Sequence, residues 1–200
     1  MNMCRYFLCF AVFSFIGWLY ESLYYTIQQK KRINSGFLST CFCPIYGIGS
    51  LLDLILLGRI ENPLVLFLAG MVVTCALEYF VSWLLEELFH QRWWDYTNWP
   101  LNINGRVCIF GAIAFGILTV ALIKVIAPVT MALISSMGTI PLYIMTAAVG
   151  FVILADTVNS VRNIDSDRLW YVEKQTELFA GAEGGRYGEL VKKLKDTLRK

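Results

Sequence analysis

The sequence predicts an all-α integral membrane protein, a bundle of about five transmembrane helices with the N-terminus outside the cell and a C-terminal tail in the cytoplasm. Three observations predict this fold class: few charged residues, long apolar runs and an uneven distribution of Lys and Arg. Of the 200 residues, 57% are apolar and only 16% are charged, whereas soluble domains carry about 25% charged residues. The composition therefore argues against a soluble enzyme.

Five segments are apolar enough to be predicted as membrane helices, and together they define a transmembrane domain over residues 1–163. A helix needs ~20 apolar residues to cross ~30 Å of hydrocarbon. Pro63 and Pro141 stand at the start of two segments, where a missing backbone N–H has little effect. The second segment is short and begins with Pro44, Gly47 and Gly49, so it is either a full span or a broken, partly re-entrant one. The predicted spans are 6–27, 42–58, 63–88, 107–127 and 141–161.

The distribution of Lys and Arg predicts the orientation. With five spans and the N-terminus outside, the inner segments are 28–41, 89–106 and the tail from residue 162. These inner segments hold fourteen Lys and Arg, against three on the outer side, which are Arg5, Arg59 and Lys124. Because cytoplasmic loops carry the excess of positive charge, the C-terminus is expected to be cytoplasmic.

Residues 164–200 form the second predicted region, a basic cytoplasmic tail. Near its end, apolar residues recur at helical spacing among Lys and Arg, which predicts a short amphipathic helix. Such a helix can lie on an anionic membrane leaflet, and a solvated tail is the alternative. The apolar positions are Tyr187, Leu190, Val191, Leu194 and Leu198.

Several carboxylates fall inside the predicted spans, where an ionisable group costs a few kcal/mol or more and tends to have a function. Glu78 lies on a stripe of small and polar residues that repeats every fourth position of the third span. From the rise of ~1.5 Å per residue, Glu21, Glu78 and Asp156 are expected in the cytoplasmic half, and Asp53 in the outer half. We therefore predict a polar cluster that opens towards the cytoplasm. Hydrogen bonding between helices alone is the other interpretation of these side chains.

The second long inner loop adds polar residues that a belt of interfacial aromatic residues does not require. It contains Trp93-Trp94-Asp95-Tyr96 and then Asn102-Ile103-Asn104-Gly105-Arg106. Arg106 is expected to pair with one of the carboxylates Glu21, Glu78 or Glu86, with Glu78 the first choice. Lysine could not replace the arginine fork in such a pair. The alternative is that Arg106 only supplies inside-positive charge and binds lipid phosphate.

These observations define a candidate substrate, ion or inter-helix polar site. No catalytic residue, cofactor or metal site is predicted, because His90 is the lone histidine and most of the six cysteines lie in apolar runs. The sequence also lacks G-x-x-x-x-G-K-[ST], G-x-S-x-G and H-E-x-x-H. The candidate site residues are Glu21, Glu78, Asp95, Asn102, Asn104, Arg106 and Asp156.

An ordered set of short motifs resembles one known family, the ABC-transporter type IV permeases, which are CmpB-like small bacterial membrane proteins. The resemblance covers residues 10–120 and leaves out the last helix and the tail. The chain departs from the family pattern at Ser35, where the family has Arg, and at Thr40-Cys41, where it has Gly-Pro. The motif residues to which the resemblance gives a structural role are Gly17, Trp18, Gly36, Pro44, Tyr46, Gly47, Trp94, Tyr96 and Gly105.

The resemblance implies a multi-pass permease in the bacterial inner or plasma membrane. Its partners would be the lipid bilayer, a separate ATPase subunit and, in one arrangement, a second copy of the chain, with no nucleic acid. Two other readings stay open at this point. One is a non-catalytic assembly or regulatory subunit, whose polar stripes hold helices together. The other is an integral membrane enzyme acting on lipid, with Glu78 or Asp95 as the acid or base.

Overall fold

The computed structural model describes residues 3–30, 34, 36–89 and 92–162. The chain divides into two compact units, residues 1–157 and 158–200. Only the end of the last helix is described in the second unit, so the architecture below is that of the first unit. The predicted cytoplasmic tail at 164–200 lies outside the described residues.

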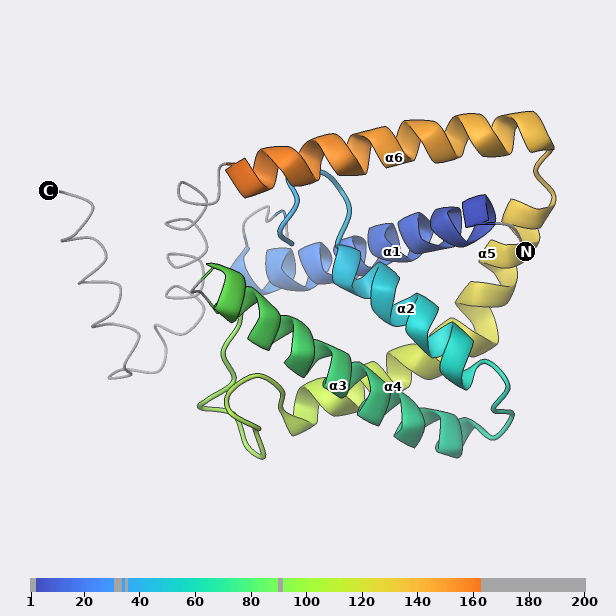
Figure 1. The fold of residues 1–200 in the computed structure, drawn as a ribbon. Coiled ribbons are helices and arrows are strands. Elements are labelled where there is room, and N and C mark those ends of the chain that lie inside the picture. The colour runs from blue at the N-terminus through green and yellow to red at the C-terminus, as the bar shows by residue number, and fades with distance from the viewer. Residues whose placement is uncertain (1–2, 31–33, 35, 90–91, 163–200) are drawn as a thin grey trace, which may run out of the picture. The chain divides into compact units, whose positions relative to one another are not determined.

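The described part of the chain is helical and contains no strand, which confirms the all-α fold class (Figure 1). Within the described residues, one isolated antiparallel β-bridge joins Ile103 to Val107 in the loop before α4. Four helical stretches are long and apolar enough to cross a membrane. The elements are α1 Met3–Gln29, α2 Pro44–Leu57, α3 Pro63–Phe89, α4 Ile109–Ala121, η1 Leu122–Ile126, α5 Ala127–Ser135 and α6 Thr139–Arg162.

The second predicted span differs from the other four. The helix α2 forms as expected, but its 14 residues extend only about 21 Å, which is short of ~30 Å of hydrocarbon. It is therefore not long enough to cross a membrane as a helix by itself. Its N-terminus carries Pro44 at the first helical position, where proline fits best.

The fourth predicted span was wrong at its C-terminal end. We expected 107–127, but a continuous helical stretch runs from Ile109 to Ser135. The π-helical turn η1 precedes Pro128, and in it the Ala127 N–H donates to the Leu122 carbonyl. A wider turn at this position accommodates the proline ring, which would clash with the preceding turn of a regular α-helix. The stretch therefore continues as α5 instead of ending.

The helices pack through small residues. The closest pairs are α1 with α2 and α3 with α4. A Cβ atom added to Gly17 would overlap the Tyr46 ring, and one added to Gly70 would overlap Thr119. Small residues let membrane helices approach each other in this way.

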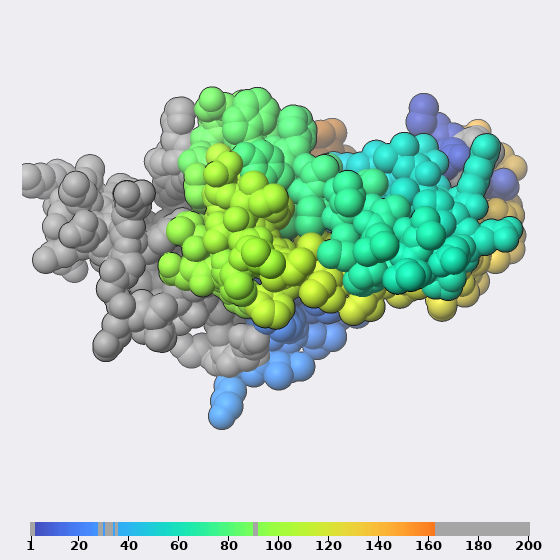
Figure 2. Space-filling model, turned by 90° about the horizontal axis from the view of Figure 1, so that it is seen from below, coloured from blue at the N-terminus to red at the C-terminus, as the bar shows by residue number. Residues whose placement is uncertain are grey.

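Apolar side chains fill the space between the helices and also cover the outside of the bundle. One buried cluster joins α1 to η1, α5 and α6 through residues that include Phe13, Ala127 and Leu142. On one face of the molecule, α3 lies at the surface (Figure 2). The exposed side chains of α3 include Leu64, Leu68 and Val72. Lipid is the environment that such a surface requires.

Candidate functional site

A break in the helical structure precedes α2, and it lies beside the middle of α1. Residues 36–43 are not helical. The Trp18 indole donates to Asn34, and the Cys43 backbone N–H donates to the Ser14 carbonyl over 3.1 Å. Because Ser14 is near the middle of α1, the helix α2 begins about halfway along that helix and not at its end (Figure 1). The second passage along α1 therefore consists of a non-helical segment followed by a short helix.

Three residues of the sequence motifs hold this break in place. The Tyr46 ring lies directly against the backbone of Gly17, where no side chain could fit. A Cβ atom added to Gly47 would likewise overlap Ser14 and Phe10 of α1. A larger residue at either glycine would force the N-terminus of α2 away from α1, which gives both glycines a clear structural role.

A buried carboxyl group lies near this break. Glu78 of α3 is only 6% exposed, and its Oε1 accepts a hydrogen bond from the Tyr96 hydroxyl over 3.3 Å. Its Oε2 is buried and has no hydrogen-bond partner among the residues that the structure describes. The Cys43 thiol donates to Glu21 of α1 over 3.8 Å. Glu21 also acts electrostatically on Glu78.

Tyr96 comes from the loop after α3 and acts as a hydrogen-bond donor. Burial raises the pKa of the Tyr96 phenol well above its usual value, and the negative charge of Glu78 adds to this effect. The phenol therefore keeps its proton at physiological pH. The sequence had indicated Tyr96 only as a motif residue, and its position against Glu78 is a new finding.

Arg106 pairs with Glu86, not with Glu78, so the first choice made from the sequence was wrong. One guanidinium nitrogen is 2.6 Å from Glu86 Oε2 and another donates to Ser82 Oγ over 3.2 Å. Arg92 binds the same Glu86 oxygen at 2.9 Å. Glu86 is two helical turns beyond Glu78 on the same stripe, next to the start of α4, which explains why it is the carboxylate that Arg106 reaches.

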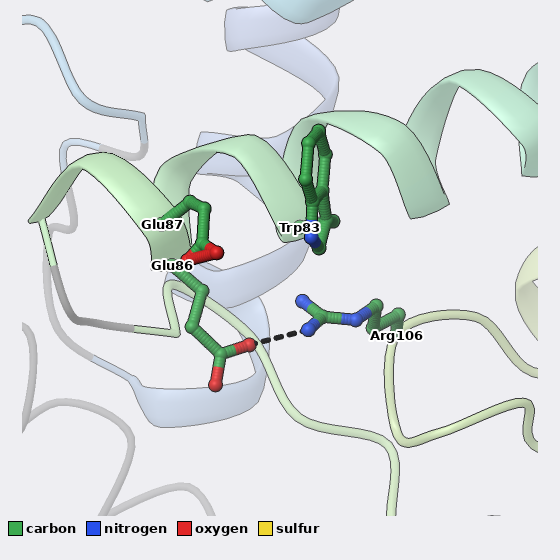
Figure 3. Close-up of a pocket in the computed structure, with 4 residues that line it drawn as sticks. All are labelled: Trp83, Glu86, Glu87 and Arg106. Carbon is green, nitrogen blue, oxygen red and sulfur yellow. Dashed lines mark ion pairs between the residues drawn. The ribbon is translucent and has the colours of Figure 1, made fainter.

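A cavity opens beside this ion pair. It has a volume of about 430 Å³ and is lined by Trp83, Glu86, Glu87 and Arg106. Figure 3 shows the Arg106 guanidinium directed at the Glu86 carboxylate, with Trp83 and Glu87 on the adjoining turns of α3. The Arg106 side chain is only 10% exposed and the Glu86 side chain 35% exposed. Two of the Arg106 guanidinium nitrogens are already engaged inside the protein, by Glu86 and Ser82.

The remaining polar residues of the predicted site in this loop hold the loop together. Asp95 accepts hydrogen bonds from the backbone N–H and the hydroxyl of Thr97. Asn102 donates to the carbonyls of Thr97 and Trp99 and accepts from the Gly105 N–H.

The loop then turns back towards Tyr96 and Arg106. Asn104 and Gly105 have positive φ values of 53° and 69°, a conformation that asparagine and glycine adopt most readily. The Gly105 carbonyl accepts from the Tyr96 N–H, and the Arg106 carbonyl accepts from the Trp94 indole. The asparagines and the glycine thus place Tyr96 and Arg106 against α3.

Asp156 lies apart from Glu78 and binds the segment before α2. The backbone N–H and the hydroxyl of Thr40 donate to Asp156 Oδ2 over 2.8 Å and 2.6 Å. Asp53 is a similar case between α2 and α4, where its Oδ2 accepts from the Thr119 hydroxyl over 2.6 Å. Nothing in the sequence pattern had indicated Thr40 or Thr119 as partners.

Comparison with known proteins identifies the family. A family model described as "Putative ABC-transporter type IV" matches residues 8–161. The match extends through nearly all of α6, whereas the motifs had led us to expect that it would end near residue 120. Neither a curated protein nor a solved structure matches the chain. The chain is a multi-pass membrane protein and belongs to this CmpB-type family of ABC-transporter type IV proteins.

Proposed function

We propose that the chain is the permease subunit of an ABC-type transport system and that a separate protein supplies the ATPase. The family assignment supports this role. The sequence contains no G-x-x-x-x-G-K-[ST] motif, which is the phosphate-binding loop that an ATPase subunit of this kind would need. The ATP-hydrolysing step therefore belongs to a partner.

The observation that carries the proposal is the break before α2. Non-helical backbone at membrane depth is tolerated where it is buried in protein or lines a polar cavity. Many transporters place substrate and ion sites at such breaks, where helices are discontinuous. Here the break is next to Glu21, and Glu78 and Tyr96 complete the polar cluster.

A co-purification experiment tests this role. The full chain is tagged, expressed in its native host and purified in a mild detergent, and co-purifying proteins are identified by mass spectrometry. We expect a stoichiometric partner with a phosphate-binding loop, and an ATPase rate that depends on the chain. Glu78→Ala should keep the partner and change the ATPase rate, whereas Glu61→Ala, at an exposed loop position, should leave both unchanged. A stoichiometric complex without any ATPase would contradict the proposal.

A non-catalytic assembly or regulatory subunit is the second candidate, and one observation favours it. Three intramembrane carboxylates are bound by side chains of the same chain, since Asp53, Glu86 and Asp156 each have such a partner. The Asp53–Thr119 contact joins α2 to α4, as polar residues in membranes commonly do. The other two contacts bind α3 and α6 to non-helical segments of the chain. A complex in which Glu78→Ala has no effect on any activity would favour this candidate.

A further inference from the structure

We infer that Glu78 is a proton-binding site, where a single proton is taken up and released at the carboxyl oxygen that faces no hydrogen-bond partner. The inference rests on the proposed transport function only in what the bound proton would be used for.

One carboxylate oxygen of Glu78 is buried inside the bundle. The stripe that repeats every fourth residue directs Gly70, Glu78 and Ser82 inwards, and all three are buried. Tyr96 satisfies Oε1, and Oε2 has no partner within the described part of the chain. An ionised carboxylate with a bare oxygen in a low-dielectric interior is strongly disfavoured. A proton on this oxygen removes that cost.

The neighbours of Glu78 make ionisation less favourable still. Glu21 on α1 acts electrostatically on Glu78, and two nearby carboxyl groups cannot easily both be ionised. The arginine that could have neutralised Glu78 is bound two turns away, because Arg106 is held by Glu86 and Ser82. The other titratable groups that act on Glu78 or on its partner Tyr96 are Tyr25, Cys75 and Cys108.

The side chains around Glu78 favour a proton over a metal ion, because the described residues contain no group of three or more His, Cys, Asp or Glu that could hold one. The cavity of about 430 Å³ is at Trp83, Glu86, Glu87 and Arg106, which places it at the next carboxylate of the stripe. A proton needs no cavity, whereas a bound metal ion needs several oxygen ligands around it. The chemistry is a simple acid–base step. A proton from water forms an O–H bond at Oε2 and gives a neutral carboxylic acid, and the same bond breaks when the proton returns to water.

Infrared difference spectroscopy of the purified full chain in lipid nanodiscs tests this inference. The C=O stretch of a protonated carboxyl group is recorded in H₂O and in D₂O, because deuteration shifts it. At neutral pH we expect one such signal that is lost in Glu78→Gln and retained at a shifted position in Glu78→Asp. The matched control is Glu61→Gln, which should leave the signal unchanged. The absence of any Glu78-dependent signal between neutral and mildly acidic pH would overturn the inference.

A sodium titration separates a proton from a metal cation. The same spectrum is recorded at constant pH while sodium chloride replaces choline chloride. We expect no change in the Glu78 signal, and a loss of the signal on adding sodium would assign the site to a metal cation instead. Circular dichroism confirms that each variant is folded. The measurement uses the isolated chain and needs no ATPase, so the proton site and the proposed transport function can fail independently.

Discussion

Replacing Arg106 with lysine changes the number of groups that one side chain can bind at the end of α3. The arginine uses one nitrogen for Glu86 and another for Ser82, and its guanidinium carbon is 5.6 Å from the centre of the Tyr79 ring. Lysine has a single nitrogen and no planar group to place on the ring. It can keep the ion pair with Glu86, but it cannot make all three contacts at once.

The loss of stability expected for Arg106→Lys follows from how deeply Arg106 and Glu86 are buried. Hydrogen bonds to charged groups contribute about 1.5–3 kcal/mol when shielded, and ion pairs at the surface contribute about 0–1 kcal/mol. The Arg106 side chain is 10% exposed, but Glu86 is 35% exposed and also holds Arg92. We therefore expect Arg106→Lys to lower the free energy of unfolding by about 1–2 kcal/mol, a factor of about 5–30 in the folded-to-unfolded ratio.

Reversible unfolding in mixed detergent micelles, followed by circular dichroism, measures this difference. The matched control is Arg59→Lys, which makes the same chemical change at an exposed loop residue and should alter stability by less than about 0.5 kcal/mol. In a double-mutant cycle, Arg106→Ala combined with Glu86→Gln should cost less than the sum of the two single changes. An Arg106→Lys protein as stable as the wild type would refute the reasoning, and would leave Arg106 with a role as positive charge only.

The remaining predictions concern topology, helix packing and pH. A reporter fused to the C-terminus should be active only in the cytoplasm, because fourteen of the seventeen Lys and Arg are on the predicted inner side; activity only outside would reverse the orientation. Gly17→Ala should destabilise the protein by about 1–3 kcal/mol through overlap with Tyr46, whereas Gly138→Ala, with only ordinary contacts, should be close to neutral. Burial raises the pKa of Tyr96, so the folded state keeps this proton longer than the unfolded state, and stability should fall as the pH rises above about 10. Tyr96→Phe should reduce this loss, and an identical pH profile would show that Tyr96 does not cause it.

The helices could be predicted well because length and apolar content determine them directly. The predicted limits 63–88 and 141–161 are within two residues of α3 and α6. The error at 107–127 lay at the C-terminal end, where a π-helical turn precedes Pro128 and the helical stretch continues to Ser135. A local change of this kind depends on how the neighbouring helices pack, which a hydropathy pattern does not contain.

The candidate site was harder to predict because its contacts join distant parts of the chain. Helical spacing correctly placed Glu78 on an inward-facing stripe. It could not decide which of three carboxylates pairs with Arg106. The partners of Asp53 and Asp156 are 66 and 116 residues away in the sequence. Thr40, the partner of Asp156, stands where the chain departs from the family pattern, and that departure was the only signal that could have drawn attention to it.

Glu78 and Glu86, the two glutamates of the α3 stripe, differ in their bonding partners. Glu86 and Glu78 are two turns apart on one helix, yet Glu86 binds two arginines and Glu78 receives only one neutral hydrogen bond. A carboxylate that is fully paired stabilises the fold, and its removal leaves uncompensated positive charge. A buried carboxyl group with a bare oxygen adds little to stability, because its desolvation is not offset. We therefore expect substitutions at Glu78 to affect activity more than folding, with the reverse order at Glu86.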